Sequence, residues 1–343
     1  MRTSLCVSAA LLVVAFGLAL PLHAQEAPSP GGPPPASSAP SEQPVDIGDT
    51  QTLKVNVNLV NVYFSVRDKN GYITNLAKDD CQIYEDKVLQ KTKNFTQEKK
   101  LPLTIGILLD TSGSQQNVLP MEQDAGAEFL KDVLTPKDEA FLISFDINVD
   151  LLADYTNSPS ELRRAMQKAS INTGAGTGSV TGNATPRGTL LYDAVYLAAH
   201  DKLRQEAGRK VLVILTDGQD QGSQENIRTA IEAAQKSNAL VYVILIADVR
   251  AYGGIGYFGA GDMDRLARET GGRVINVGNN GKKLQEAFDQ IQDELRTQYL
   301  ASYTPTNLKT DGSFRTLNIT CGKDTKVQAR KGYYALADSP DNN

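Results

Sequence analysis

The sequence predicts an α/β protein with a doubly wound, mostly parallel sheet and a smaller flanking β domain. Across residues 101–297, short apolar runs alternate with amphipathic stretches that are long enough to form helices. Before and after this region, apolar and polar residues alternate instead, which is typical of strands with one buried face. A stretch rich in Pro and Ser, with few residues that could pack, precedes all of it. These observations predict an α/β domain set between two β segments.

Five apolar runs are the expected strands of the central sheet. They lie at residues 103–109, 140–145, 211–215, 241–246 and 273–277. Because none of them alternates, both faces of each strand are expected to be buried, as in parallel sheets covered by helices.

Amphipathic stretches lie between and after these runs. They cover residues 121–134, 159–169, 190–205, 224–236, 262–269 and 282–296. Strand and helix in alternation over almost 200 residues predict a doubly wound sheet rather than a bundle or a sandwich.

The two flanks, residues 50–98 and 299–336, carry the alternating pattern. A shift of phase near Val60 indicates a break or bulge in the first strand. Neither flank is long enough for a separate sandwich, so we expect the two to pack together as one β domain. A disulfide between Cys81 and Cys321 would join them; two separate buried thiols are the alternative.

The N-terminal region has the pattern of an exported protein. Residues 1–24 contain Arg2, an apolar run that begins at Leu5 and the small residue Ala24, as in a signal peptide. Residues 25–49 are rich in Pro and Ser and are expected to form a disordered linker. The protein is therefore expected to be secreted or periplasmic, without membrane insertion once the signal peptide is removed.

Charge and histidine content exclude several functions. A formal net charge of −5 gives no general attraction to nucleic acid. Of two histidines, His23 lies in the signal peptide and only His200 remains. A zinc site with two histidines is impossible, and a Ser-His-Asp triad could use only His200.

Oxygen-bearing side chains follow the predicted strands. The first strand leads into Asp110-Thr111-Ser112-Gly113-Ser114, the third into Thr216-Asp217-Gly218, and Thr189 precedes a predicted helix. Ligands of open α/β sheets bind beyond the carboxyl ends of the strands. Carboxylates and hydroxyls are hard ligands that suit one Mg²⁺ or Mn²⁺ ion. The expected metal ligands are Asp110, Ser112, Ser114, Thr189 and Asp217.

The order Asp110-x-Ser112-x-Ser114, then Thr189, then Asp217 resembles the metal-ion-dependent adhesion site of von Willebrand factor type A domains. The resemblance covers residues 101–297 and implies that Ser112, Ser114 and Thr189 contact the metal directly. It implies that Asp110 and Asp217 act largely through water, and that an acidic side chain of a partner completes the shell. The whole chain also resembles secreted bacterial proteins described as VWFA-related.

Other interpretations of these residues remain open. Asp110 and Ser112 could form a strand-end turn that caps a helix. Threonines at 173, 177, 181 and 185 are alternatives to Thr189, while Asp193 and Asp220 favour helix capping or solvated surface. The glycine-rich stretches 174–178 and 253–259 favour loops, since the first lacks the Lys of a phosphate-binding loop.

The favoured function is non-enzymatic: the metal coordinates an acidic group of a protein or extracellular polymer. An envelope scaffold or assembly protein is the structural alternative. A Mg²⁺-dependent hydrolase with Asp110 as nucleophile would want a second acid where Ser112 stands. An aspartic protease would want Gly directly after Asp110-Thr111, where Ser112 is inserted.

Overall fold

The computed structural model describes residues 59–98, 101–172, 188–246 and 259–336, and all of these belong to one unit, Val55–Asn343. The predicted signal peptide and linker lie outside the described residues. So do the glycine-rich stretch 174–178, most of 253–259 and the four alternative threonines.

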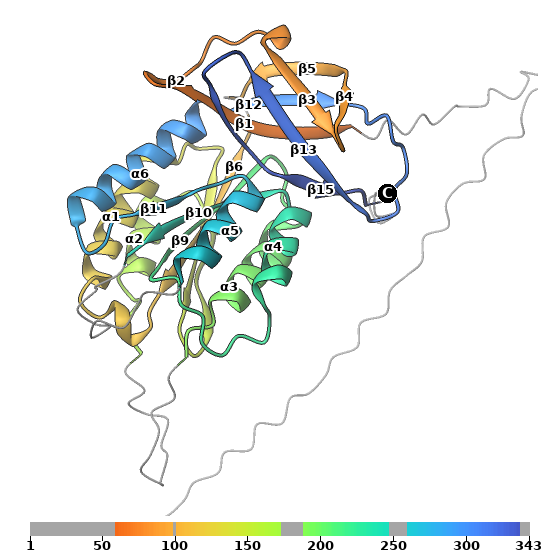
Figure 1. Ribbon diagram of the computed structural model, residues 1–343. Coiled ribbons are helices and arrows are strands. Elements are labelled where there is room, and N and C mark those ends of the chain that lie inside the picture. The colour runs from red at the N-terminus through yellow and green to blue at the C-terminus, as the bar shows by residue number, and fades with distance from the viewer. Residues whose placement is uncertain (1–58, 99–100, 173–187, 247–258, 337–343) are drawn as a thin grey trace, which may run out of the picture. The chain divides into compact units, whose positions relative to one another are not determined.

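A six-stranded sheet forms the centre of the α/β domain, and Figure 1 labels four of its strands, β6, β9, β10 and β11. The strand order is β11-β10-β9-β6-β7-β8. Its strands are β6 (Leu103–Asp110), β7 (Glu139–Phe145), β8 (Val149–Thr156), β9 (Arg209–Thr216), β10 (Ala239–Leu245) and β11 (Val274–Asn276). All pairs are parallel except β7 with β8. Every residue of β6, β9 and β10 is buried, which explains their unbroken apolar runs.

Helices cover both faces of this sheet. They are α1 (Leu119–Val133), α2 (Pro159–Met166), α3 (Leu191–Leu197), α4 (Ile227–Lys236), α5 (Ala260–Thr270) and α6 (Gly281–Arg296). One apolar core contains side chains of α1, α2 and α6, and a second contains those of α3, α4 and α5. The doubly wound fold class is thereby confirmed.

Strand β8 is an element that the sequence analysis missed. It returns antiparallel along β7 after a short turn and forms one edge of the sheet. No residue of β8 is fully buried, so it lacks the apolar run that marks the central strands. The helix predicted at 190–205 also differs, because α3 continues into a π-helical stretch, Ala198–Leu203, and ends there.

The flanking segments share two antiparallel sheets. The first sheet contains, in order, β14 (Lys326–Ala329), β1 (Val60–Asp68), β12 (Tyr299–Tyr303) and β5 (Thr92–Gln97), and β2 (Gly71–Tyr72) pairs with β1. The second sheet contains, in order, β15 (Gly332–Tyr334), β13 (Phe314–Cys321), β3 (Cys81–Glu85) and β4 (Val88–Gln90). Strands from before and after the α/β domain alternate in the first sheet, and the two segments meet in the second sheet where β13 pairs with β3. Side chains of both sheets form a third apolar core. This confirms a flanking β domain from both segments, whereas its exact limits remain a proposal.

A disulfide joins Cys81 in β3 to Cys321 in β13, with Cα atoms 4.1 Å apart. The two residues face each other directly in the register of the antiparallel pair. The bond therefore links the N-terminal and C-terminal parts of the β domain across a separation of 240 residues.

A buried carboxylate connects the β domain to the α/β domain. Glu294 of α6 is 1% exposed and accepts hydrogen bonds from Tyr242 of β10 (2.8 Å), from Tyr72 of β2 (2.9 Å) and, more weakly, from Ser65 of β1 (3.4 Å). It also forms an ion pair with Arg273 at 3.0 Å. A buried charge is tolerated when it is paired and hydrogen-bonded, as Glu294 is.

Among the described residues, no helix is both long and apolar enough to span a membrane.

Replacing both Cys81 and Cys321 by Ala is expected to lower the free energy of unfolding by about 2–5 kcal/mol, because the unfolded chain regains the freedom of a very long loop. Chemical denaturation of the oxidised wild type beside the double variant measures the difference. A reductant should destabilise the wild type to the level of the variant and leave the variant unchanged. Two reactive thiols in the unreduced wild type would contradict the disulfide.

Candidate metal-binding site

The carboxyl ends of β6 and β9 meet at one edge of the central sheet. These strands are parallel neighbours although about 100 residues separate them, with Leu109 opposite Leu215. Asp110 is the last residue of β6, and Asp217 directly follows β9. The order of the strands changes direction between β6 and β9, which is where open α/β sheets form ligand crevices.

Four of the five predicted ligands lie together here. The hydroxyl oxygens of Ser112 and Ser114 are 3.0 Å apart, and Ser114 Oγ donates to Asp217 Oδ2 at 2.6 Å. Asp110 joins the group through its Oδ1, which accepts from the Ser112 backbone N–H at 3.0 Å. The structure therefore collects two carboxylates and two hydroxyls from loops that lie far apart in the sequence.

Asp110 is fully buried beneath these hydroxyls. Burial, followed by the nearby charge of Asp217, raises the pKa of its carboxyl to about 7. Hydrogen bonds from Ser112 and Thr216 oppose this rise, with Thr216 Oγ1 donating to Asp110 Oδ2 at 2.6 Å. The negative charge of the site is therefore only partly compensated by the protein, and a bound cation would compensate it further.

Thr189 lies on a separate loop beside this group. Its backbone pairs with Gln221 in an isolated bridge, with both N–H···O distances 2.9 Å, and its side chain is 6% exposed. The next residue, Leu190, donates its N–H to the backbone oxygen of Asp146 at 2.8 Å. Thr189 is thus connected to the other four residues through Leu190 and Asp146. Its role as a direct metal ligand remains a proposal.

Asp146 is a supporting residue that the sequence analysis missed. It follows β7, and its Oδ2 accepts from Thr111 Oγ1 at 2.8 Å while its Oδ1 accepts from Asn172 Nδ2 at 3.1 Å. Asp146 therefore holds the Asp110–Ser114 loop against the loop of Thr189. The signal was present in the sequence as a third carboxylate directly after an apolar run.

Two further buried polar residues, Gln115 and Glu122, stand close to the site in the sequence. Gln115 is 1% exposed and Glu122 is fully buried in the first turn of α1. Within the described part of the chain, neither carboxylate oxygen of Glu122 has a hydrogen-bond partner. Burial, followed by the charges of Asp110 and Asp217, raises the pKa of Glu122 well above its usual range. No pattern in the sequence distinguished this carboxyl from a solvated helix residue.

The capping interpretation explains Asp193 and Asp220 better than it explains the cluster. Asp193 accepts from the backbone N–H groups of Gln224 and Glu225, and Asp220 from that of Tyr192. Ser112 precedes a short 3₁₀ helix, Gly113–Gln115, but its side chain makes no capping hydrogen bond.

The residues present fit a hard divalent cation. Every side-chain atom of the cluster that could reach a metal is oxygen, which suits Mg²⁺ and Mn²⁺. Within the described ranges there is no group of three or more His, Cys, Asp or Glu side chains placed to share an ion. An ion here would therefore depend on the serine and threonine hydroxyls as well as on the two aspartates.

The family model of the von Willebrand factor type A domain matches residues 105–290, more than half of the chain. The chain therefore belongs to the von Willebrand factor type A family, as the motif resemblance predicted. A search of curated proteins found no match.

Several solved structures are similar in fold. The conserved hypothetical protein BatB from Bacteroides thetaiotaomicron has 17% identity and a TM-score of 0.42, over 57% of this chain and 99% of that one. The mussel byssus proximal thread matrix protein 1, solved with a zinc-occupied MIDAS motif, has 15% identity and a TM-score of 0.47, over 62% and 50%. The vWF domain of the type V pili tip protein Mfa5 from Porphyromonas gingivalis has 12% identity and a TM-score of 0.43. This match covers 58% of this chain and 96% of that one.

We expect Glu122→Gln to stabilise the metal-free protein at neutral pH. Since the pKa of Glu122 is raised on folding, the wild type loses stability as pH rises above the pKa of the unfolded chain, near 4.5. The glutamine variant lacks this loss, which amounts to about 1.4 kcal/mol for each unit of pKa difference. Denaturation at several pH values in a chelating buffer measures the effect.

The exposed Asp124 on the same helix supplies the control, since Asp124→Asn should leave the pH dependence as it is. Parallel curves of stability against pH for wild type and Glu122→Gln would contradict the prediction.

Proposed function

We propose that this chain is an exported, non-enzymatic binding protein that holds one divalent cation and uses it to coordinate an acidic group of a partner. The observation that carries the proposal is the hydrogen-bonded cluster of Asp110, Ser112, Ser114 and Asp217 at the switch point of the sheet. The partner would be a protein or an extracellular polymer.

The assigned roles follow the chemistry of the ligands. Ser112, Ser114 and Thr189 would contact Mg²⁺ or Mn²⁺ through their hydroxyls, while Asp110 and Asp217 would act largely through water. With neutral hydroxyls as the direct ligands, the bound ion keeps much of its positive charge. A carboxylate from the partner would then complete the coordination shell.

A nucleophilic role for Asp110 is less well supported. Both of its carboxylate oxygens already accept hydrogen bonds, and the residue is fully buried. The partners of His200 also give no support to a catalytic triad. This exposed residue contacts Asp201 and stacks on Tyr196, on the helix that follows Thr189. An envelope scaffold that uses the same fold without a metal-dependent partner is the second candidate.

Export is part of this proposal and has independent support. The disulfide between Cys81 and Cys321 is the kind of bond that persists in oxidising compartments such as the periplasm or the extracellular space. It agrees with the signal peptide proposed for residues 1–24.

The test is calorimetric titration of Mg²⁺, Mn²⁺ and Zn²⁺ into chelator-treated protein, with and without a short acidic peptide. We expect one Mg²⁺ or Mn²⁺ ion per chain, tighter binding than for Zn²⁺, and peptide binding only when metal is present. Ser112→Ala and Asp110→Asn should each weaken the metal at least about tenfold, which corresponds to about 1.4 kcal/mol.

Ser160→Ala removes an exposed hydroxyl at the start of α2 and is the matched control, expected to bind metal as the wild type does. Thermal melts show that each variant folds. If the wild type binds no ion even with peptide present, the cluster is a structural turn and the scaffold candidate gains support.

A further inference from the structure

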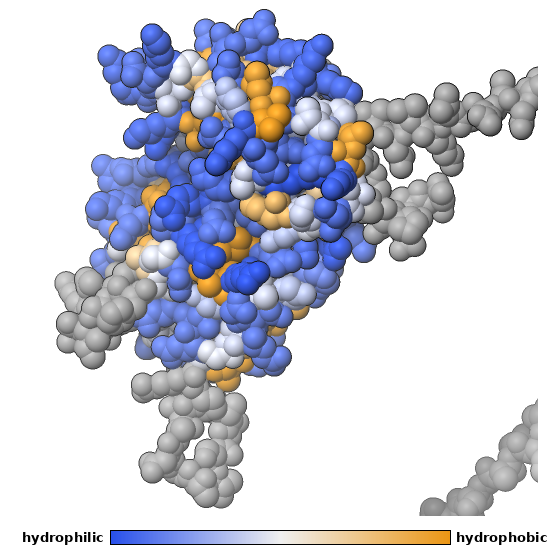
Figure 2. Space-filling view, turned by 45° about the vertical axis from the view of Figure 1, so that its right-hand side comes forward, coloured by the Kyte–Doolittle hydropathy of each residue, from blue (hydrophilic) through white to orange (hydrophobic). Residues whose placement is uncertain are grey.

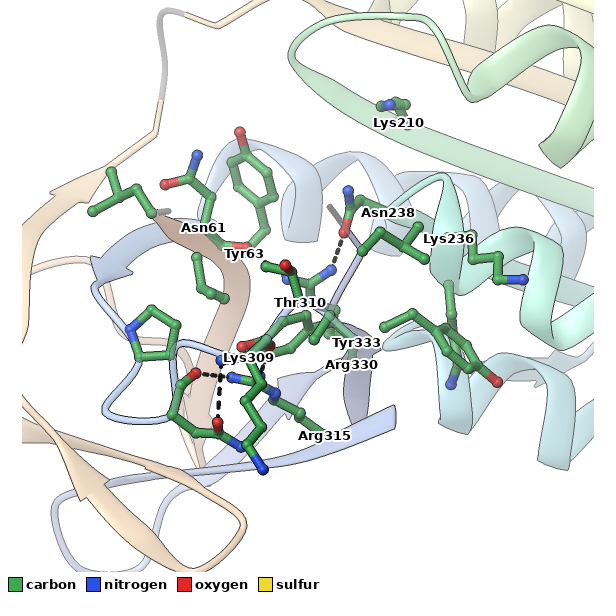
Figure 3. A pocket seen from close by; sticks show the side chains of 18 of the residues that line it. Asn61, Tyr63, Lys210, Lys236, Asn238, Lys309, Thr310, Arg315, Arg330 and Tyr333 are labelled. Carbon is green, nitrogen blue, oxygen red and sulfur yellow. Dashed lines mark hydrogen bonds between the residues drawn. The ribbon is translucent and has the colours of Figure 1, made fainter. Parts of the chain in front are cut away.

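A cavity of about 720 Å³ lies between β9 and the β domain, at the end of the central sheet opposite the Asp110 cluster. Its volume falls within the roughly 300–1,000 Å³ typical of small-molecule sites. The walls come from the α/β domain at Lys210 and Asn238 and from the β domain at Tyr63, Arg330 and Tyr333 (Figure 3). Lys210 is the second residue of β9, at the end of the strand opposite to Asp217.

The cavity wall is strongly basic. Of the described residues that line it, five are cationic, namely Lys210, Lys236, Lys309, Arg315 and Arg330, and one is a carboxylate, Glu206. Two of the five already have acidic partners outside the lining, since Lys236 pairs with Glu232 and Arg315 with Glu85. Three cations remain against Glu206: Lys309, which is exposed, and Lys210 and Arg330, which are buried.

Lys210 and Arg330 are buried cations whose charge is not neutralised by an ion pair, although the charge of Glu206 acts on Lys210 from a distance. They are 8% and 9% exposed, and neither forms an ion pair within the described part of the chain. Among the described residues, Arg330 donates to two neutral groups, the Asn238 side chain and the Asn61 backbone oxygen, and its Nε has no partner there. Burial lowers the pKa of Lys210 and lowers that of Arg330 to about 10. Uncompensated buried charges are costly, and an anion in the cavity would remove much of that cost.

Arg315 stabilises one wall of the cavity. Its guanidinium pairs with Glu85 at 3.0 Å and donates to the backbone oxygens of Asn307 and Lys309. It thereby fixes the loop between β12 and β13 that forms one wall. The cavity is therefore built on a buried ion pair rather than on loose surface side chains.

Apolar side chains stand around the same cavity. Leu59, Leu308 and Leu336 line it and are 38%, 67% and 41% exposed. Figure 2 shows a largely hydrophilic surface on which apolar residues form only small separate patches. Three exposed leucines beside two unpaired buried cations are a match for a ligand with an anionic head and an apolar body.

We propose that this cavity binds one amphiphilic anion, a carboxylate or phosphate head group on a short aliphatic chain. The Lys210 ammonium group contacts the head, Arg330 adds positive charge behind it, and the three leucines cover the chain. The proposal does not rest on metal binding, because the cavity and the Asp110 cluster share no residue.

Calorimetric titration of octanoate and of octyl phosphate, in a chelating buffer that removes divalent cations, tests the proposal. We expect one molecule bound per chain and at least about tenfold weaker binding by Lys210→Met, which keeps the length of the side chain and removes its charge. Comparison of the two probes distinguishes the head groups. Neutral octanol and inorganic phosphate alone should bind at least tenfold more weakly than the better probe.

Lys282→Met is the matched control, because Lys282 is an exposed helix residue outside the cavity and its loss should leave binding unchanged. Thermal melts confirm folding of both variants. The proposal is overturned if the wild type binds neither probe, or if Lys210→Met binds as tightly as the wild type. It is also overturned if a variant ending at Leu336 binds and the full chain does not, since residues 337–343, with Asp338 and Asp341, would then be the occupant.

Discussion

The parallel pairing of β6 with β9 brings two carboxylates, Asp110 and Asp217, to one edge of the sheet, and the surrounding structure accommodates their repulsion. Thr216 and the Ser112 backbone donate to Asp110, and Ser114 donates to Asp217. These donors reduce the cost of burying like charges but supply no positive charge. The raised pKa of Asp110 expresses the remaining imbalance. The strands and their donors hold the oxygens of this cluster in place, which supports the cation site that we propose.

The β domain depends on two connections of different kinds. The Cys81–Cys321 bond fixes its two sequence segments to each other, while Glu294 attaches them to α6 and β10 through hydrogen bonds and an ion pair. Removing only one partner of such a buried network leaves an uncompensated charge, so its members are interdependent. A separate contact between the domains lies at the basic cavity, where Arg330 of the β domain donates to Asn238.

How well the sequence predicts each part of this structure depends on how deeply that part is buried. Strands β6, β9 and β10 are buried on both faces, so their apolar runs were unambiguous, and the ends of those runs located Asp110 and Asp217. Strand β8 was missed because an edge strand with partly exposed residues carries a weak pattern. Glu122 and Lys210 could not be recognised, because a charged residue in a helix or strand reads as solvated until tertiary packing buries it.

The two ends of β9 have opposite electrostatic character. Asp217 follows the carboxyl end and Lys210 lies at the amino end, with the intervening strand fully buried. At about 3.3 Å per residue they are separated by roughly 23 Å. Two unit charges this far apart interact by only about 0.7 kcal/mol at an effective dielectric constant of about 20, so charge at one end has little direct effect on a ligand at the other. A cation at the sheet's carboxyl edge and an anion at its amino edge would therefore bind as nearly independent events. Any coupling measured between them would have to travel through the packing of the sheet itself.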